Sequence, residues 1–227
     1  MNILTYLLEK YPKKPWNWRY ISANPNITME FIETHPDNPW NWYWISSNPN
    51  ITMEIIEKYP EKSWNWYWIS CNPNITMELI EEYPNKPWRW DGISWNPNTT
   101  MDIIEKYPNK PWNWYYISKN LNITMEDIEN QPEKPWNWEE ICSNPNITME
   151  DIEKHPYDPC WWSISKNPNI TIEFIEKYLD KLNFYQLSMN ELTFENTRMK
   201  KKEEYFLLEK ERSFHKLMNL YVVNQYM

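Results

Sequence analysis

The segment Asn48-Pro49-Asn50-Ile51-Thr52-Met53-Glu54 decides the fold, because close copies of it recur along the chain at a fixed spacing. Successive copies start 24 residues apart, except for the last step, which is 23 residues. Self-similarity at such a period is typical of repeat proteins, in which each unit stacks only on its neighbours. The copies start at Asn24, Asn48, Asn72, Asn96, Asn120, Asn144 and Asn167.

Each copy belongs to a unit that predicts two short helices. Thr28 can cap a helix that begins at Met29, and Pro36 ends that helix. Pro39 suits the first turn of a second helix. Helices this short cannot bury their apolar faces alone, so the units must stack. A half-unit precedes the first copy, and a unit of weaker similarity follows the last. The sequence therefore predicts an all-α fold, an α-solenoid of about eight 24-residue two-helix repeats.

Positions that keep one residue type from repeat to repeat predict the core. The positions of Ile32 and Ile45 are aliphatic in every unit. We expect them to be buried together with Ile27, Met29 and the second tryptophan of each unit. That aromatic column reads Trp18, Trp42, Trp66, Trp90, Trp114, Trp138, Trp162 and Tyr185.

The two positions after the second tryptophan vary, and variation of this kind suggests exposure to solvent. Early repeats carry aromatic residues there, whereas Asp91-Gly92 and Glu139-Glu140 replace them later. Aromatic side chains serve as anchors in protein interfaces. Stacking on sugars or on single-stranded nucleic acid is the alternative use of such an aromatic stripe. The expected partner-binding residues are Tyr43, Trp44, Tyr67, Trp68, Tyr115 and Tyr116.

Charge and composition narrow the function further. The chain has 23 basic and 32 acidic residues, a net charge of −9, which disfavours a phosphate backbone as the main partner. No apolar run approaches the roughly 18 residues of a membrane span, and no leader sequence is recognisable. Cys71, Cys142 and Cys160 are too few and too scattered for a disulfide framework. We therefore expect a cytoplasmic protein that binds another protein and no membrane.

The sequence contains no recognisable catalytic constellation. It lacks a Ser/His/Asp set, a phosphate-binding loop and metal-ligand spacing. The acidic column that includes Glu33 repeats in eight units, which argues for structure and against a paired-carboxylate site. The Asn-X-Thr sequons coincide with helix caps, so we do not expect glycosylation. The prediction is a protein without catalytic activity, cofactor or metal.

Beyond Asn190 the repeat pattern fades. We place the repeat domain at residues 1–195 and a second segment at 196–227, whose apolar spacing predicts an amphipathic helix. This helix would cap the last repeat. Docking to a partner or self-association is the alternative.

The run from Ile45 to Ile56 resembles the 24-residue leucine-rich repeat variant family, whose members form a superhelix of short helices. The form Lys110-Pro111-Trp112-Asn113-Trp114 is similar to repeat proteins of giant, mimivirus-like DNA viruses. The resemblance covers roughly residues 3–195 and lacks the cysteine cluster with which some family members bind iron–sulfur groups. It implies a solenoid, brings no catalytic residues, and would place a viral protein in the host cytoplasm or the virion.

Overall fold

The computed structural model describes residues 2–155 and 160–190, and every regular element in these ranges is a helix. The predicted segment 196–227 and its capping helix lie outside the described residues. The sixteen helices are α1 (Ile3–Lys10), α2 (Trp18–Ala23), α3 (Met29–Thr34), α4 (Trp42–Ile45), α5 (Met53–Lys58), α6 (Trp66–Cys71), α7 (Met77–Glu82), α8 (Trp90–Trp95), α9 (Met101–Lys106), α10 (Trp114–Lys119), α11 (Met125–Asn130), α12 (Trp138–Ser143), α13 (Met149–Lys154), α14 (Trp161–Ile164), α15 (Ile172–Lys177) and α16 (Phe184–Met189).

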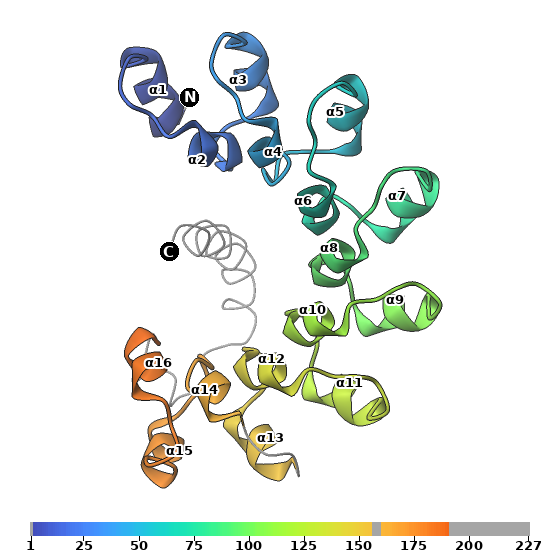
Figure 1. Ribbon diagram of the computed structural model, residues 1–227, viewed down its shortest axis with the longest axis vertical. Helices are drawn as coiled ribbons and strands as arrows, with labels where there is room; N and C mark the ends of the chain where they lie inside the picture. Colours follow the sequence, from blue (N-terminus) through green and yellow to red (C-terminus); the bar gives the residue numbers. More distant parts are fainter. Residues whose placement is uncertain (1, 156–159, 191–227) are drawn as a thin grey trace. The chain divides into compact units, whose positions relative to one another are not determined.

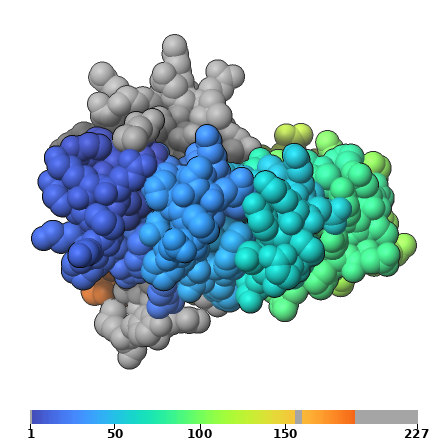
Figure 2. Space-filling view, turned by 90° about the horizontal axis from the view of Figure 1, so that it is seen from above, coloured from blue at the N-terminus to red at the C-terminus, as the bar shows by residue number. Residues whose placement is uncertain are grey.

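The chain divides into two compact units, Met1–Tyr116 and Ile117–Met227. Inside each unit the odd-numbered helices form one row and the even-numbered helices another (Figure 1). Even-numbered helices of neighbouring repeats contact each other, as α2 does with α4 and α12 with α14. Figure 2 shows successive repeats of the first unit lying side by side. The fold is the predicted α-solenoid of stacked helix pairs.

The helices begin at the residues that the sequence predicts as caps. Thr28 precedes α3, and its Oγ1 accepts the backbone N–H of Phe31 at 3.2 Å. Three helices have the full capping box: Asp127 in α11 and Asp151 in α13 bind back to the cap threonine, and Thr5 in α1 binds back to Asn2. The even-numbered helices mostly begin after an asparagine; the side chain of Asn65, for example, accepts the N–H groups of Tyr67 and Trp68. These caps satisfy N–H groups that a six-residue helix would otherwise leave open.

The isoleucine positions predicted to form the core are buried. Isoleucines equivalent to Ile27 and Ile45 lie inside both units and have almost no exposed surface. The core position shifts in the last described repeat, where Phe174 is buried and Ile172 is 39% exposed. The largest of the fully buried side chains are Ile27, Ile45, Ile51, Ile69, Ile75, Ile93, Ile117, Ile123, Ile128, Ile141, Ile147 and Ile164.

The tryptophan column departs from the prediction in two ways. Its members, such as Trp90, are only partly buried and pack at the edge of the core. Trp162 is 43% exposed and does not belong to the column, because α14 begins at Trp161. The residue missing from this repeat therefore precedes Trp161. A second residue is missing before α16, so its first residue, Phe184, takes the place that we assigned to Tyr185.

The partly buried tryptophans join neighbouring repeats. The ring of Trp40 meets that of Trp18 in the preceding repeat edge to face, with centroids 5.0 Å apart. The indole N–H of Trp40 also donates to the backbone oxygen of His35 at 2.8 Å. An edge-to-face pair adds to the stability that burial of the rings provides, and the hydrogen bond removes the cost of burying the indole nitrogen. The same edge-to-face contact occurs in Trp42–Trp64, Trp66–Trp88 and Trp90–Trp112.

The asparagines of the repeated motif bind the backbone of the preceding repeat. The Nδ2 group of Asn48 lies 2.9 Å from the carbonyl oxygen of Asn24 and 3.0 Å from that of Ile27. Its Oδ1 accepts the N–H of Asn50, whose own Nδ2 donates to the oxygen of Pro25. In several sequons the amide nitrogen that a glycan would modify is thus already hydrogen-bonded. Equivalent contacts to the preceding repeat start from Asn72, Asn74, Asn96, Asn98, Asn144, Asn146, Asn167, Asn169 and Asn190.

We predict that Asn96→Ala lowers the free energy of unfolding by about 3 kcal/mol, because it leaves buried carbonyl oxygens without a donor. Asn96 Nδ2 lies 2.8 Å from the oxygens of both Ser70 and Asn72. The control is Asn85→Ala, at an exposed position, where we expect a change within roughly 0.5 kcal/mol. Urea denaturation followed by tryptophan fluorescence measures both. Equal effects of the two substitutions would contradict this role of the asparagines.

Candidate interaction surface

The even-numbered helices of the first unit carry a group of aromatic side chains that reach solvent. Tyr20, Tyr43 and Tyr115 are 45%, 44% and 43% exposed. Tyr67, Trp95 and Tyr116 are half-buried between them in the repeat array. We call these six residues the aromatic face.

Four of the six residues predicted to bind a partner belong to this face, but Trp44 and Trp68 do not. They are only 7% and 3% exposed, so the prediction that they are exposed is wrong. Each packs its ring edge to face against the tyrosine before it, with centroids 5.4 Å apart for Trp44 and 5.1 Å for Trp68. The guanidinium of Arg19 covers Trp44 at 4.9 Å. The residue at this position varies because its neighbours differ from repeat to repeat. In a sequence, such variation looks the same as variation at an exposed position.

Gly92 occupies in α8 the position of Trp44 in α4 and Trp68 in α6. A Cβ atom at Gly92 would lie 2.7 Å from the backbone oxygen of Tyr67 and 2.9 Å from Ser70 Cβ. Helices α6 and α8 are therefore too close for any side chain at this position.

A compact aromatic cluster lies around this glycine. Tyr116 comes from α10, two repeats after Tyr67, and the two ring centroids are 6.4 Å apart. The Tyr116 ring also stacks on Trp95, with centroids 5.9 Å apart and an angle of 24° between the planes. The sequence shows a glycine at position 92. It does not show that aromatic rings from separate repeats meet beside this glycine.

Two ionisable side chains at this cluster, Tyr67 and Cys71, are held in their neutral forms. Burial raises the pKa of the Tyr67 hydroxyl well above its ordinary value, and the neighbouring Cys71 and Tyr116 act in the same direction. Burial likewise raises the pKa of the Cys71 thiol. A thiol that stays protonated is a poor nucleophile, so Cys71 is a packing residue.

Charges beside the aromatic face are largely compensated. Arg89 binds Asp91 through two hydrogen bonds of 3.2 and 3.1 Å. In the second unit, the equivalent positions hold Glu139 and Glu140, and Lys119 lies 3.3 Å from Glu140. The even-numbered helices thus present neutral aromatic groups in the first unit and acidic groups in part of the second.

The other candidate groups have structural surroundings. Glu33 of the acidic column accepts hydrogen bonds from Lys58 and Tyr59 of the next repeat, and the bond from Lys58 is the main cause that lowers its pKa. Cys71 and Cys142 are buried thiols. Within residues 2–155 and 160–190, no cluster of three or more His, Cys, Asp or Glu side chains could hold a metal ion.

The same ranges contain no helix long and apolar enough to cross a membrane.

No known protein family, curated protein or solved structure gave a match to this chain. The tandem helical repeat is evident in the chain itself. Its resemblance to leucine-rich variant repeats or to viral repeats has no support from these comparisons.

We predict that Gly92→Ala destabilises the protein by roughly 1–3 kcal/mol, because the new methyl group collides with the backbone of α6. The sign is informative, since alanine normally stabilises a helix interior by about 1 kcal/mol relative to glycine. Thermal unfolding measured by circular dichroism tests this. A variant as stable as the parent, or more so, would contradict the close approach of α6 and α8.

Proposed function

We propose that this chain is a protein-binding solenoid without catalytic activity, and that the aromatic face of the first unit contacts the partner. One observation carries the proposal: Tyr20, Tyr43 and Tyr115 each expose more than two-fifths of their surface beside a half-buried aromatic cluster. Tyrosine provides a large contact area and a hydroxyl at little conformational cost, and this suits it to protein interfaces. Stacked repeats position such residues along a surface that one protein partner can span.

The alternatives receive less support from the same surface. Binding of single-stranded nucleic acid combines stacking with a basic groove. Here Arg89 is paired with Asp91, Arg19 covers Trp44, and the chain carries a net charge of −9. Stacking on a sugar would use an exposed indole, but Trp44 and Trp68 are buried, and Trp95 is half-buried with its ring stacked on Tyr116.

Further parts of the proposal rest on the sequence. A scaffold function is compatible with the absence of a recognisable catalytic motif. The resemblance to repeat proteins of giant viruses suggests a viral source, with the protein in the host cytoplasm or the virion. A reducing compartment fits three cysteines that are too few and too scattered for a disulfide framework.

We predict that a photo-activated phenylalanine analogue placed at Tyr43 or at Tyr115 crosslinks to a protein in extract of the source cells. The matched control is the same analogue at Tyr6, which is 45% exposed but lies on α1 and outside the aromatic face. Crosslinks from Tyr6 to a second copy of the chain are counted separately, because its hydroxyl accepts a hydrogen bond from Lys10 beside the α1–α2 loop. Mass spectrometry of the crosslinked bands identifies the partner. We expect Tyr43→Ala to weaken binding to that protein about tenfold, and Tyr6→Ala to leave it unchanged.

Two outcomes would contradict the proposal. Crosslinks from positions 43 and 115 that are sensitive to nuclease or glycosidase would identify the partner as nucleic acid or glycan. Equal crosslinking from position 6 would show that the aromatic face has no special role. Nucleic-acid binding would also weaken steeply as the salt concentration rises.

A further inference from the structure

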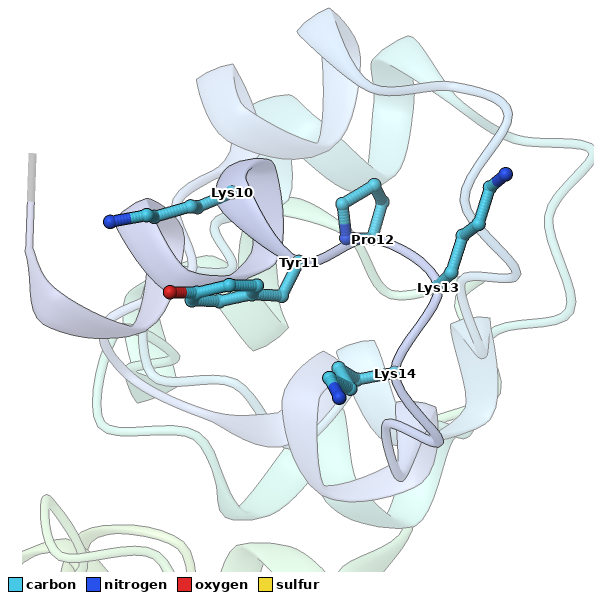
Figure 3. A pocket seen from close by; sticks show the side chains of 5 residues that line it. All are labelled: Lys10, Tyr11, Pro12, Lys13 and Lys14. Atoms are coloured by element: carbon cyan, nitrogen blue, oxygen red, sulfur yellow. The ribbon is translucent and has the colours of Figure 1, made fainter.

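A hollow lies at the loop that joins α1 to α2 in the first repeat (Figure 3). Its walls are formed by Lys10, Tyr11, Pro12, Lys13 and Lys14. Tyr11 is 42% exposed, and all three lysines are exposed. Among the residues that the structure describes, these lysines have no carboxylate partner.

In three later repeats the equivalent lysine covers an indole of the preceding repeat, whereas Lys86 binds Glu57 of that repeat at 2.7 Å. Lys62 and Lys110 occupy the place of Lys14, two and four repeats further along. Their ammonium groups lie 5.1 Å from the ring centroid of Trp42 and 5.4 Å from that of Trp90. The same contact occurs in the second unit, where Lys181 lies 5.2 Å from the centroid of Trp161. Attraction between a cation and an aromatic ring is therefore a recurrent part of the joint between repeats.

The equivalents of Lys10 and Tyr11 bind a carboxylate of the preceding repeat. Lys58 and Tyr59 donate to one oxygen of Glu33, at 2.9 and 2.7 Å. In the second unit Lys177 pairs with Glu153 at 2.9 Å. The loops at Tyr59 and Tyr178 thus each receive one carboxylate and one aromatic ring from the repeat before them. In the hollow of the first repeat no described carboxylate pairs with the lysines, and Lys10 contacts only rings of its own repeat, Tyr6 at 5.2 Å and Tyr11 at 5.5 Å.

The last described repeat carries both missing groups. Phe184 occupies the place of Trp42 and is 60% exposed. Glu176 occupies the place of Glu33, is exposed, and forms no ion pair with a described residue. Ile172 and Met189 extend the exposed apolar surface of this repeat, at 39% and 62%.

We propose that the first repeat of one copy of this chain stacks on the last described repeat of a second copy, head to tail. In this contact Lys10 and Tyr11 bind Glu176, and Lys14 covers the ring of Phe184. The positive hollow and the acidic, apolar end are complementary in charge, and they carry the two sides of the contacts that Lys58, Tyr59 and Lys62 make with the preceding repeat. The proposal is independent of the aromatic face and concerns assembly of the protein with itself.

A contact between two different surfaces of identical copies adds further copies until the assembly closes or continues as a filament. We expect the full chain to form concentration-dependent oligomers in sedimentation velocity experiments at low salt. Lys14→Glu should weaken this association about tenfold or more, because it places a carboxylate against the ring of Phe184.

The matched control is Lys13→Glu, which makes the same change of charge in the same hollow. Its equivalents Glu61 and Glu133 pair only with the lysine that follows them in their own repeat, Lys62 and Lys134. Lys13→Glu should therefore leave association nearly unchanged. Melting curves of both variants should match the parent, since both side chains are exposed.

Mixing two defective variants tests the head-to-tail geometry. Lys14→Glu removes the head, and the double variant Glu176→Ala/Phe184→Ala removes the tail. Each alone should be monomeric, whereas their mixture should form one-to-one dimers, because each retains the half that the other needs. Monomers in the mixture would overturn the head-to-tail arrangement.

A photo-crosslinker at position 184 of the full chain identifies what covers this end. Crosslinks in the dimer band to the peptide containing residues 10–14 are expected. Crosslinks to residues 191–227 of the same copy would overturn the proposal, because that segment would then occupy the face. A chain that stays monomeric at every concentration, or a Lys13→Glu variant as defective as Lys14→Glu, would also overturn it.

Discussion

The hydrogen bonds from each asparagine to the loop of the preceding repeat are the interaction on which the rest of the structure depends. Helices of four to eight residues leave most of their carbonyl groups without an internal partner. The prolines that separate the helices prevent longer ones from satisfying these groups. Asn72 donates to a carbonyl oxygen of the preceding repeat, and the carbonyl oxygen of Asn72 accepts in turn from Asn96 of the following repeat. The equivalent asparagines supply the missing donors in the other repeats. A repeat is therefore complete only when its successor is in place.

Most of the fold could be predicted from the sequence because this requirement leaves a periodic trace. The side chain must reach equivalent carbonyl groups in every repeat, so asparagine is kept at the same position, as in Asn48 and Asn96. Thr28 and its equivalents are fixed for a similar reason, since each caps a helix start. The core isoleucines follow because no other face of such short helices is protected from water. Residues that act identically in every repeat are thus readable from one chain.

The candidate surface was less predictable because its residues act differently from one repeat to the next. One position of the repeat is filled by buried indoles in Trp44 and Trp68. The same position is a glycine at Gly92, where α6 and α8 approach too closely for a side chain. Only the packing reveals that Tyr116 reaches Tyr67 across two repeats. The missing residue before Trp161 caused a different error, because it shifted the alignment by one position. The position of the missing residue becomes clear only in the structure, from the residue at which α14 begins.

The direction of the asparagine contacts has a consequence for synthesis of the chain. Each donor lies 20 to 26 residues after the carbonyl that it binds, so its partner leaves the ribosome first. A newly made repeat therefore completes the one already present and exposes its own carbonyls to the next. Structure of this kind grows in one direction by local steps, with little loop-closure entropy to overcome at any of them. Translation therefore delivers each acceptor before its donor, so a repeat can be completed as soon as the next one has left the ribosome.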